Sequence, residues 1–91
     1  MSRAAMIPMI SDLALQYAPY GIRVNGVAPG WIDTGMNDSL PPGEYEIERK
    51  KIWLHQQFLP VEDVARPIVF LLSSGAAGIT GQNLIVDGGY R

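Results

Sequence analysis

The sequence has 91 residues, a formal net charge of −2 and no cysteine. Its length allows one small domain at most, and the lack of cysteine excludes disulfides and thiolate metal sites. No apolar run approaches the ~18 residues of a membrane span and no segment resembles a secretion signal, so we expect a cytoplasmic protein. Hydrophobic residues make up 47% of the chain, which indicates an apolar surface that packs on a partner.

The charged residues do not predict a nucleic-acid site. The only basic cluster, Arg49-Lys50-Lys51, directly follows three glutamates at positions 44, 46 and 48. Opposite charges within helical reach favour a solvated helix face over a patch for phosphate or an acidic partner. His55 is the only histidine, so by itself it forms neither a metal site nor a catalytic triad, and we predict no metal.

The first predicted element is a helix over residues 4–17. Pro8 either kinks this helix or is its first residue, because proline lacks a backbone donor and disfavours a helical residue before it. Pro19 and Gly21 then stop the helix and reverse the chain. Apolar residues recur at intervals of three and four and predict one buried stripe: Met6, Met9, Ile10, Leu13 and Tyr17.

A short β-branched segment over residues 22–28 predicts a strand buried on both faces of a parallel sheet, and Pro29-Gly30 ends it. The stretch from Trp31 to Glu44 is rich in turn-forming residues, which favours an exposed loop. Residues 44–58 predict an amphipathic helix. The side chains that this helix turns inward are Ile47, Leu54 and either Tyr45 or Trp53.

A third helix is predicted to open at Leu59-Pro60 and to carry acidic residues in its first turn. Pro67 lies inside it and either bends it or costs about 3 kcal/mol. Its buried stripe consists of Val64, Ile68, Leu71 and Leu72. A second apolar strand follows at residues 83–86, closed by Asp87-Gly88-Gly89.

The order of helix, strand, helices and strand predicts an α/β crossover unit with a parallel sheet. Two strands are too few to form such a sheet alone, because both faces need a cover and both edges stay unpaired. We therefore predict that the sequence forms a slice of a larger α/β sheet.

Residues 18–34, from Ala18-Pro19-Tyr20-Gly21 to Pro29-Gly30-Trp31-Ile32-Asp33-Thr34, resemble the short-chain dehydrogenase/reductase family where its sixth strand meets the cofactor site. Further matches follow in the family's order at 60–65, 70–74, 79–82 and 86–89. The resemblance is weakest between Asn37 and Gln57. It implies the C-terminal portion of a Rossmann-like doubly wound parallel sheet, with the last two strands and their helices.

In that family the segment that matches residues 29–34 lies against the nicotinamide end of NAD or NADP. The resemblance implies that Pro29 and Gly30 turn the backbone toward the ring, at the sheet edge where open α/β sheets bind ligands. It also implies that the backbone of Ile32 meets the carboxamide and that the Thr34 hydroxyl reaches the carboxamide or the pyrophosphate. The alternative is an ordinary strand-to-loop turn.

The family's catalytic residues do not map onto this sequence. Its members use a tyrosine for proton transfer, with a lysine four residues later. Aligning Ser2-Arg3-Ala4-Ala5 with that helix puts Arg3 at the lysine position and the tyrosine two residues before Met1. A guanidinium does not replace an ammonium where geometry is tight, so we assign no catalytic residue to the chain. The glycine-rich loop and the NAD/NADP selector also lie upstream, which leaves cofactor preference undetermined.

The resemblance divides residues 1–91 into four parts of one domain. Residues 1–18 are the end of the catalytic and dimer helix, 22–36 the strand and nicotinamide-side loop, 37–58 a substrate lid, and 60–91 the last helix and strand. It implies a homo-oligomer formed through the 4–17 helix, although part of that stripe is core within the chain. Three apolar residues either face the substrate or belong to plain core: Met36, Trp53 and Leu54.

We therefore expect a fragment, or a mis-started gene product, of an NAD(P)-dependent oxidoreductase that interconverts a small-molecule alcohol and a carbonyl compound. Nucleic acid and membrane are not expected partners. Alone, the chain is expected to be inactive and marginally folded, because a sheet edge and an apolar helix face stay exposed. The alternative is a non-catalytic association module that docks on a full-length relative. A nucleotide-binding member without activity is disfavoured because the sequence has no pyrophosphate-binding loop.

Overall fold

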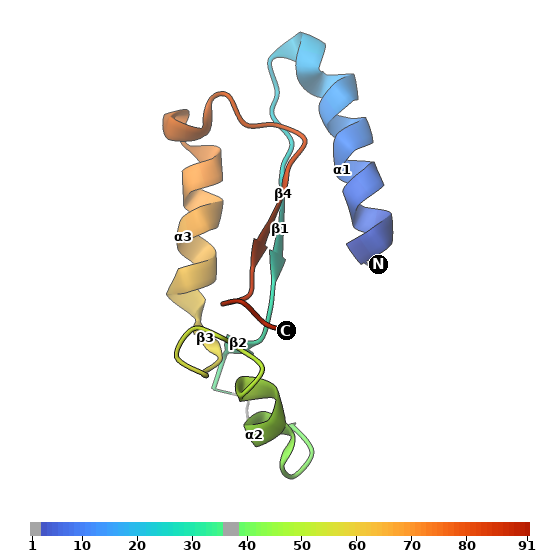
Figure 1. Cartoon of the computed structure of the whole chain (residues 1–91). Helices are drawn as coiled ribbons and strands as arrows, with labels where there is room; N and C mark the ends of the chain where they lie inside the picture. Colours follow the sequence, from blue (N-terminus) through green and yellow to red (C-terminus); the bar gives the residue numbers. More distant parts are fainter. Residues whose placement is uncertain (1–2, 36–38) are drawn as a thin grey trace.

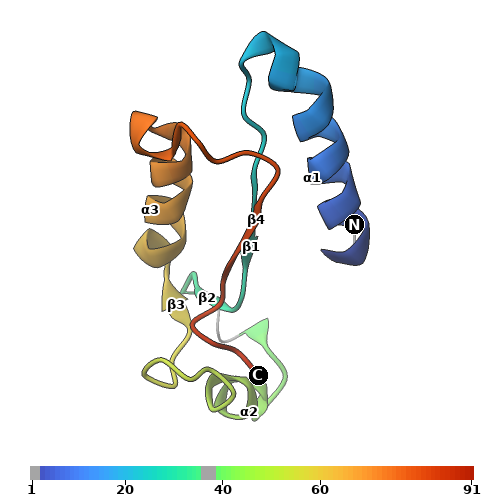
Figure 2. The same ribbon diagram turned by 45° about the horizontal axis from the view of Figure 1, so that its top comes forward.

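The computed structural model describes residues 3–35 and 39–91, with side chains from Met6 onward. The helices are α1 (Arg3–Tyr17), α2 (Glu44–Arg49) and α3 (Val61–Leu72), and single 3-10 turns follow α1 at Ala18–Tyr20 and α3 at Ser74–Ala76. The strands are β1 (Gly26–Pro29), β2 (Ile32–Asp33), β3 (Leu59–Pro60) and β4 (Asn83–Val86). Helices α1 and α3 lie on opposite sides of the β1–β4 pair (Figures 1 and 2).

The strands form two parallel pairs. Strand β1 pairs with β4 from Gly26↔Asn83 to Pro29↔Val86, and the chain passes through α2 and α3 between them. Parallel strands joined through helices confirm the predicted α/β class and its Rossmann-like arrangement. Strands β2 and β3 form the second pair, with Ile32 opposite Leu59. This pair was not predicted, since two residues are too few to show an alternating pattern.

The core of the described chain is small and lies along the sheet. A Cβ atom at Gly26 would collide with the Ile10 side chain, so α1 packs directly on β1. Leu71 and Val64 turn inward from α3. The other buried apolar residues are Ala14, Ala28, Ile52, Phe58, Leu59 and Ala76. Helices α1 and α3 therefore each bury one narrow stripe, and the buried stripes predicted from the sequence are confirmed only in part.

The predicted strand over residues 22–28 is shorter than expected, because β1 begins at Gly26. Before it, side-chain hydrogen bonds accompany the backbone hydrogen bond from the Gly81 amide to the Val24 carbonyl. The Val24 amide donates to the Thr80 hydroxyl over 3.1 Å, and the Asn25 carboxamide bridges the Ile79 carbonyl and the Gln82 amide. The polar residues around the turn at 79–82 thus hold an extended segment that is not a strand.

The second predicted helix, over residues 44–58, is wrong in its length. Helix α2 ends at Arg49, and turns occupy most of the segment up to β3. Both His55 and Gln56 have positive φ angles, of 61° and 49°, which no helix accommodates. The Leu54 amide donates to the Gly88 carbonyl over 2.9 Å, so a contact with the chain's end outweighs helical periodicity here.

Pro8 and Pro67 both lie inside helices, so a helix start at Pro8 is wrong, whereas a bend at either proline stays a prediction. Helix α1 begins at Arg3, so Pro8 is not its first residue; it lies inside the helix on an exposed face. Helix α3 runs without interruption through Pro67, and its first turn carries Glu62 and Asp63 as predicted. Of its predicted stripe, Ile68 is 41% and Leu72 79% exposed, so only half of that stripe is buried.

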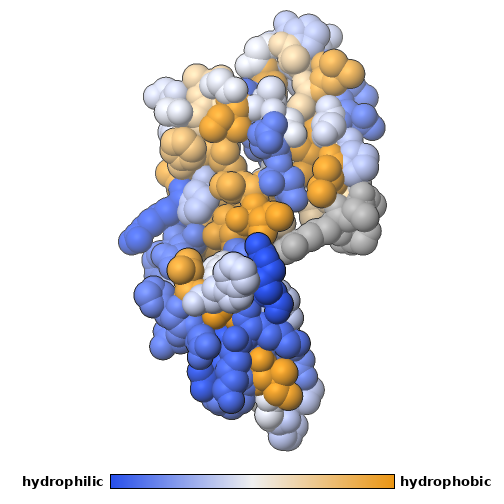
Figure 3. All heavy atoms as spheres, in the orientation of Figure 1, coloured by the Kyte–Doolittle hydropathy of each residue, from blue (hydrophilic) through white to orange (hydrophobic). Residues whose placement is uncertain are grey.

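The chain is elongated and exposes much apolar surface. Its radius of gyration is 15.6 Å, whereas a compact domain of this length has about 12 Å. Its accessible surface is 6371 Å², against roughly 5200 Å² for a folded monomer of this mass. Figure 3 shows apolar residues gathered over the strands and α3, while the end around α2 is mostly hydrophilic. Within the described ranges, no helix is long and apolar enough to cross a membrane.

Candidate functional site

A cavity of about 380 Å³ lies beyond the carboxyl ends of β1 and β4, where its lining residues follow the two strands. These residues are Gly30, Trp31, Asp87 and Tyr90. Because adjacent parallel strands end at the same edge, segments separated by more than fifty residues meet there. Open α/β sheets bind their ligands at this edge, which makes the strand-end cavity the candidate site.

Gly30 allows the two strand ends to approach each other closely. Its amide donates to the Val86 carbonyl over 3.0 Å. A Cβ atom on Gly30 would lie 2.8 Å from the Asp87 Cβ and 3.0 Å from the Asp87 Cα. Neither atom can rotate away, so any side chain at this position must push the strand ends apart.

Asp87 is buried at the edge of the cavity and its carboxylate is held by its own turn. One oxygen, Oδ1, accepts a hydrogen bond of 2.9 Å from the Gly89 amide, and Arg91 Nη1 lies 3.6 Å from Oδ2. A carboxylate that accepts a backbone hydrogen bond two residues on fixes a tight turn. Asp87 therefore turns the chain so that Tyr90 comes back to the cavity.

Trp31 connects the cavity to α2 through a chain of aromatic rings. It stacks on Phe58 with ring centroids 5.1 Å apart, and Phe58 meets Tyr45 of α2 edge-on at 4.8 Å. The Trp31 carbonyl also accepts a hydrogen bond of 3.0 Å from the Leu59 amide. Aromatic pairs in these geometries are stabilising beyond the area that they bury.

Tyr90 connects the cavity to α2 a second time, through Glu48. Its hydroxyl donates to Glu48 Oε2 over 2.5 Å, and Lys51 Nζ lies 3.1 Å from the other oxygen of the same carboxylate. The Tyr90 hydrogen bond first, then that of Lys51, holds the pKa of Glu48 below its ordinary value of 4.5, with a smaller contribution from Trp31. The carboxylate is thus ionised at neutral pH.

The lowered pKa of Glu48 predicts a change in acid stability. Because folding lowers this pKa, the ionised carboxylate stabilises the fold above pH 4.5, and its contribution is lost as the pH falls through the folded value. We expect Glu48→Gln to show a smaller fall in thermal midpoint than the unmodified protein between about pH 6 and pH 3. Thermal unfolding across that range measures it, and equal falls in both proteins would contradict the expectation.

Of the residues predicted from the sequence, Gly30 lines the strand-end cavity. Pro29 ends β1 and is exposed, Ile32 is half-buried in β2, and Thr34 is exposed beyond β2. Their contacts with a cofactor stay predictions. Arg3 is the first residue of α1, and its side chain is outside the described part of the chain. Met36 also falls outside the described residues.

The lid residues do not line the strand-end cavity. Trp53 is 71% exposed, with the Arg91 guanidinium 5.3 Å from its ring centroid. Leu54 is 59% exposed and borders a separate hollow of about 160 Å³, which the residues of β3 also line. Ile47 is exposed as well, so the expected inward face of the second helix is wrong for Ile47, Trp53 and Leu54. Tyr45, the remaining residue expected inward, packs on the ring of Phe58.

Asp87, Tyr90 and Glu48 were not predicted as site residues, and Trp31 was included only as part of the segment 29–34. Asp87 could have been predicted from the sequence. It directly follows β4 as Gly30 follows β1, and neighbouring parallel strands end at the same edge of a sheet. For Glu48 and Tyr90 the sequence held no such signal. Their contact joins residues 42 positions apart and depends on the turn after β4.

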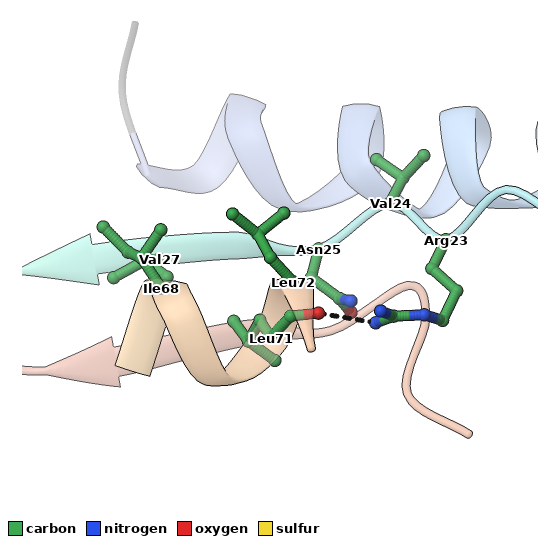
Figure 4. Close-up of a pocket in the computed structure, with 7 residues that line it drawn as sticks. All are labelled: Arg23, Val24, Asn25, Val27, Ile68, Leu71 and Leu72. Carbon is green, nitrogen blue, oxygen red and sulfur yellow. Dashed lines mark hydrogen bonds between the residues drawn. The ribbon is translucent and has the colours of Figure 1, made fainter. Parts of the chain in front are cut away.

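A second cavity, of about 300 Å³, lies between α3 and β1 (Figure 4). Its polar groups are already engaged: Arg23 with carbonyls at the end of α3, and Asn25 with the turn at 79–82. The rest of its lining is apolar, from Val24 and Val27 to Ile68 and Leu72. No group of three potential metal ligands exists among the residues that the structure describes.

The sequence was compared with known proteins. A family model described as enoyl-(acyl carrier protein) reductase matches residues 1–91. An NAD-dependent glycerol dehydrogenase of Listeria innocua is 40% identical over 98% of this chain and 35% of its own length. A 3-oxoacyl-(acyl carrier protein) reductase of Rickettsia prowazekii is 44% identical over 97% of this chain and 36% of its own. A D-arabinitol 2-dehydrogenase of Scheffersomyces stipitis is 37% identical over 100% and 34%.

The chain thus spans about a third of the length of the curated relatives that it matches. The match to the family model covers every residue, and the parallel strands with a glycine at their shared end agree with the architecture of such enzymes. On these grounds the chain belongs to the short-chain dehydrogenase/reductase family of oxidoreductases.

Proposed function

We propose that this chain forms the nicotinamide-side wall of an NAD(P)-dependent oxidoreductase that interconverts an alcohol and a carbonyl compound by hydride transfer. The observation that supports this proposal is the strand-end cavity, where Gly30 brings the backbone of one strand end against Asp87 of the other. The named activities of the Listeria and Scheffersomyces relatives are also those of dehydrogenases acting on polyols.

The residues of the cavity fit a nicotinamide group. A volume of about 380 Å³ lies within the range of small-molecule sites, and the flat rings of Trp31 and Tyr90 are suited to an aromatic ligand. The cofactor, when bound, supplies or accepts the hydride. The chain's own part would be to hold the ring: Gly30 leaves room along the backbone, the Ile32 backbone would contact the carboxamide, and the Thr34 hydroxyl would reach the carboxamide or the pyrophosphate.

Proton transfer is assigned to residues outside this sequence. Within the described chain, nothing resembles a nucleophile with its base, and the titratable residues that line the cavity, Asp87 and Tyr90, are both engaged in hydrogen bonds. A general acid or base must reach the reacting atom with a free proton site. The chain alone is therefore expected to have no turnover, and its contribution in the whole enzyme is binding and orientation.

A second candidate function is association without chemistry, through α1. It exposes large apolar side chains on several sides, among them Ile7, Met9 and Leu15, of which Leu15 is 76% exposed. Apolar side chains gathered on one exposed helix favour a protein partner, such as a second copy of the same helix. This surface is compatible with both functions, so cofactor binding is the property that separates them.

The experiment is a titration with NADH and NADPH of two proteins, the full-length protein that carries this sequence and the 91-residue chain alone. Nicotinamide fluorescence and the thermal midpoint are followed together. We expect saturable binding with a raised midpoint in the full-length protein, because a ligand that binds only the folded state stabilises it, and no binding by the chain alone. Absence of binding to the full-length protein would leave the association function in place.

A further inference from the structure

We propose that Tyr90 is a positioning residue, whose hydrogen bond to Glu48 fixes helix α2 at the mouth of the strand-end cavity and thereby shapes the substrate side of the site. The proposal rests on the proposed function for its effect on catalysis. Its structural part, the attachment of α2, stands independently of any activity.

Tyr90 takes part in two contacts at once. Its ring lines the strand-end cavity, and its hydroxyl donates over 2.5 Å to the Glu48 carboxylate in a partly buried position. Hydrogen bonds to an ionised acceptor are shorter and about twice as strong as neutral ones. Since Lys51 holds the second oxygen of that carboxylate, Glu48 has a fixed orientation toward the cavity wall.

The rest of the C-terminal strap, which we define as residues 87–91, is bound to the segment after α2. The Arg91 amide donates to the Lys51 carbonyl and the Leu54 amide to the Gly88 carbonyl, each over 2.9 Å. A Cβ atom at Gly88 would lie 2.9 Å from Ile52, which is 0% exposed. The strap and residues 48–54 therefore form one packed unit beside the strand ends.

Helix α2 cannot hold its position by itself. It has only six residues and buries none of its side chains, whereas isolated helices shorter than about 12 residues are marginal in water. Its contacts to the cavity wall are the Tyr90–Glu48 hydrogen bond, a weaker contact of Glu48 with Trp31 and the pairing of Tyr45 with Phe58. Loss of the hydrogen bond leaves the other two contacts, so α2 loosens locally while the fold persists.

The test uses Tyr90→Phe in the full-length protein, which removes the hydroxyl and keeps the ring. Hydrogen exchange of amides 44–54 is followed by mass spectrometry. We expect exchange there to become about tenfold faster, the factor that corresponds to a charge-assisted hydrogen bond, with strands β1 and β4 unchanged. Glu48→Gln tests the same bond from the other partner and should give a smaller increase, since the amide oxygen still accepts.

Two matched controls keep the result specific. Glu46→Gln changes a carboxylate of the same helix that pairs with Arg49 inside α2, and Tyr20→Phe removes the hydroxyl of an exposed tyrosine near the end of α1. Tyr20→Phe should not alter exchange of amides 44–54, and Glu46→Gln, which removes one i,i+3 ion pair within α2, should accelerate it by much less than Tyr90→Phe. Equal exchange in Tyr90→Phe and the unmodified protein, or equal acceleration by Glu46→Gln, overturns the proposal.

The catalytic consequence has its own readout. In Tyr90→Phe we expect KM for the alcohol or carbonyl substrate to rise several-fold, and by a larger factor than kcat falls, because a loosened α2 weakens substrate binding more than chemistry. Glu48→Gln should shift KM in the same direction by less. If the unmodified full-length protein binds neither NADH nor NADPH, the proposed function fails, while the exchange experiment still decides whether Tyr90 holds α2.

Discussion

Replacing Gly30 by alanine is expected to destabilise the full-length protein by about 1–3 kcal/mol and to weaken nicotinamide binding by tenfold or more. The new methyl group would lie 2.8 Å from the Asp87 Cβ and 3.0 Å from its Cα. Both neighbours are fixed to the backbone after β4, so the strand ends must separate. The strand-end cavity lies between them and is distorted by the same movement.

Gly78→Ala is the matched control for this substitution. A Cβ atom at Gly78 meets no atom within 4 Å, so the same change of composition adds no clash. Thermal unfolding measures the stability of both variants, and nicotinamide fluorescence measures their cofactor affinity. A Gly30→Ala protein as stable as Gly78→Ala, with unchanged affinity, would show that the close approach of Gly30 to Asp87 is not required.

The elements that the sequence predicts well are the two longer helices and the strands of the main pair. Helices α1 and α3 and strand β4 are found near their expected bounds and β1 begins four residues late, with Ile10 of α1 and Leu71 of α3 buried on opposite sides of the pair (Figure 1). In these elements local periodicity and tertiary burial favour the same conformation. Agreement between the two is the reason why their type could be predicted from the sequence.

The segment between Trp31 and Phe58 could not be predicted in the same way. Lys51 and Leu54 are bonded to partners far along the chain, Arg91 and Gly88. Ile47 and Leu54 recur at helical spacing but are exposed. Non-local hydrogen bonds thus outweigh a weak local preference for helix.

The candidate site shows the same division. Gly30 was predicted because a Pro-Gly pair at a strand end and the family resemblance both point to a close backbone approach. Asp87 and Tyr90 become part of the site only through the parallel pairing of β4 with β1, a fact of topology. The motif at the end of one strand therefore predicts only the residues that this strand contributes to the site, and the residues from its neighbour require the strand pairing.

Arg23→Ala is expected to destabilise the full-length protein by about 2–3 kcal/mol, the net value of hydrogen bonds to a charged group. The Arg23 guanidinium donates to the Leu71 carbonyl over 2.7 Å (Figure 4), and also to the Ser73 carbonyl over 3.2 Å and the Ile79 carbonyl over 3.4 Å. Helix α3 has no basic residue in its last turn, so Arg23 supplies from another element the cation that this helix end favours.

Arg23→Lys should recover less than half of the loss, because one ammonium cannot reach three carbonyls that a planar guanidinium spans. Arg66→Ala is the control, since Arg66 is an exposed arginine on the same helix, away from its last turn. Chemical denaturation of the three variants measures the effect. Arg23 lies at the opposite end of β1 from the strand-end cavity. The Arg23→Ala protein that remains folded should therefore keep its nicotinamide affinity. A loss of affinity that accompanies the loss of stability would mean that the two ends of β1 are coupled.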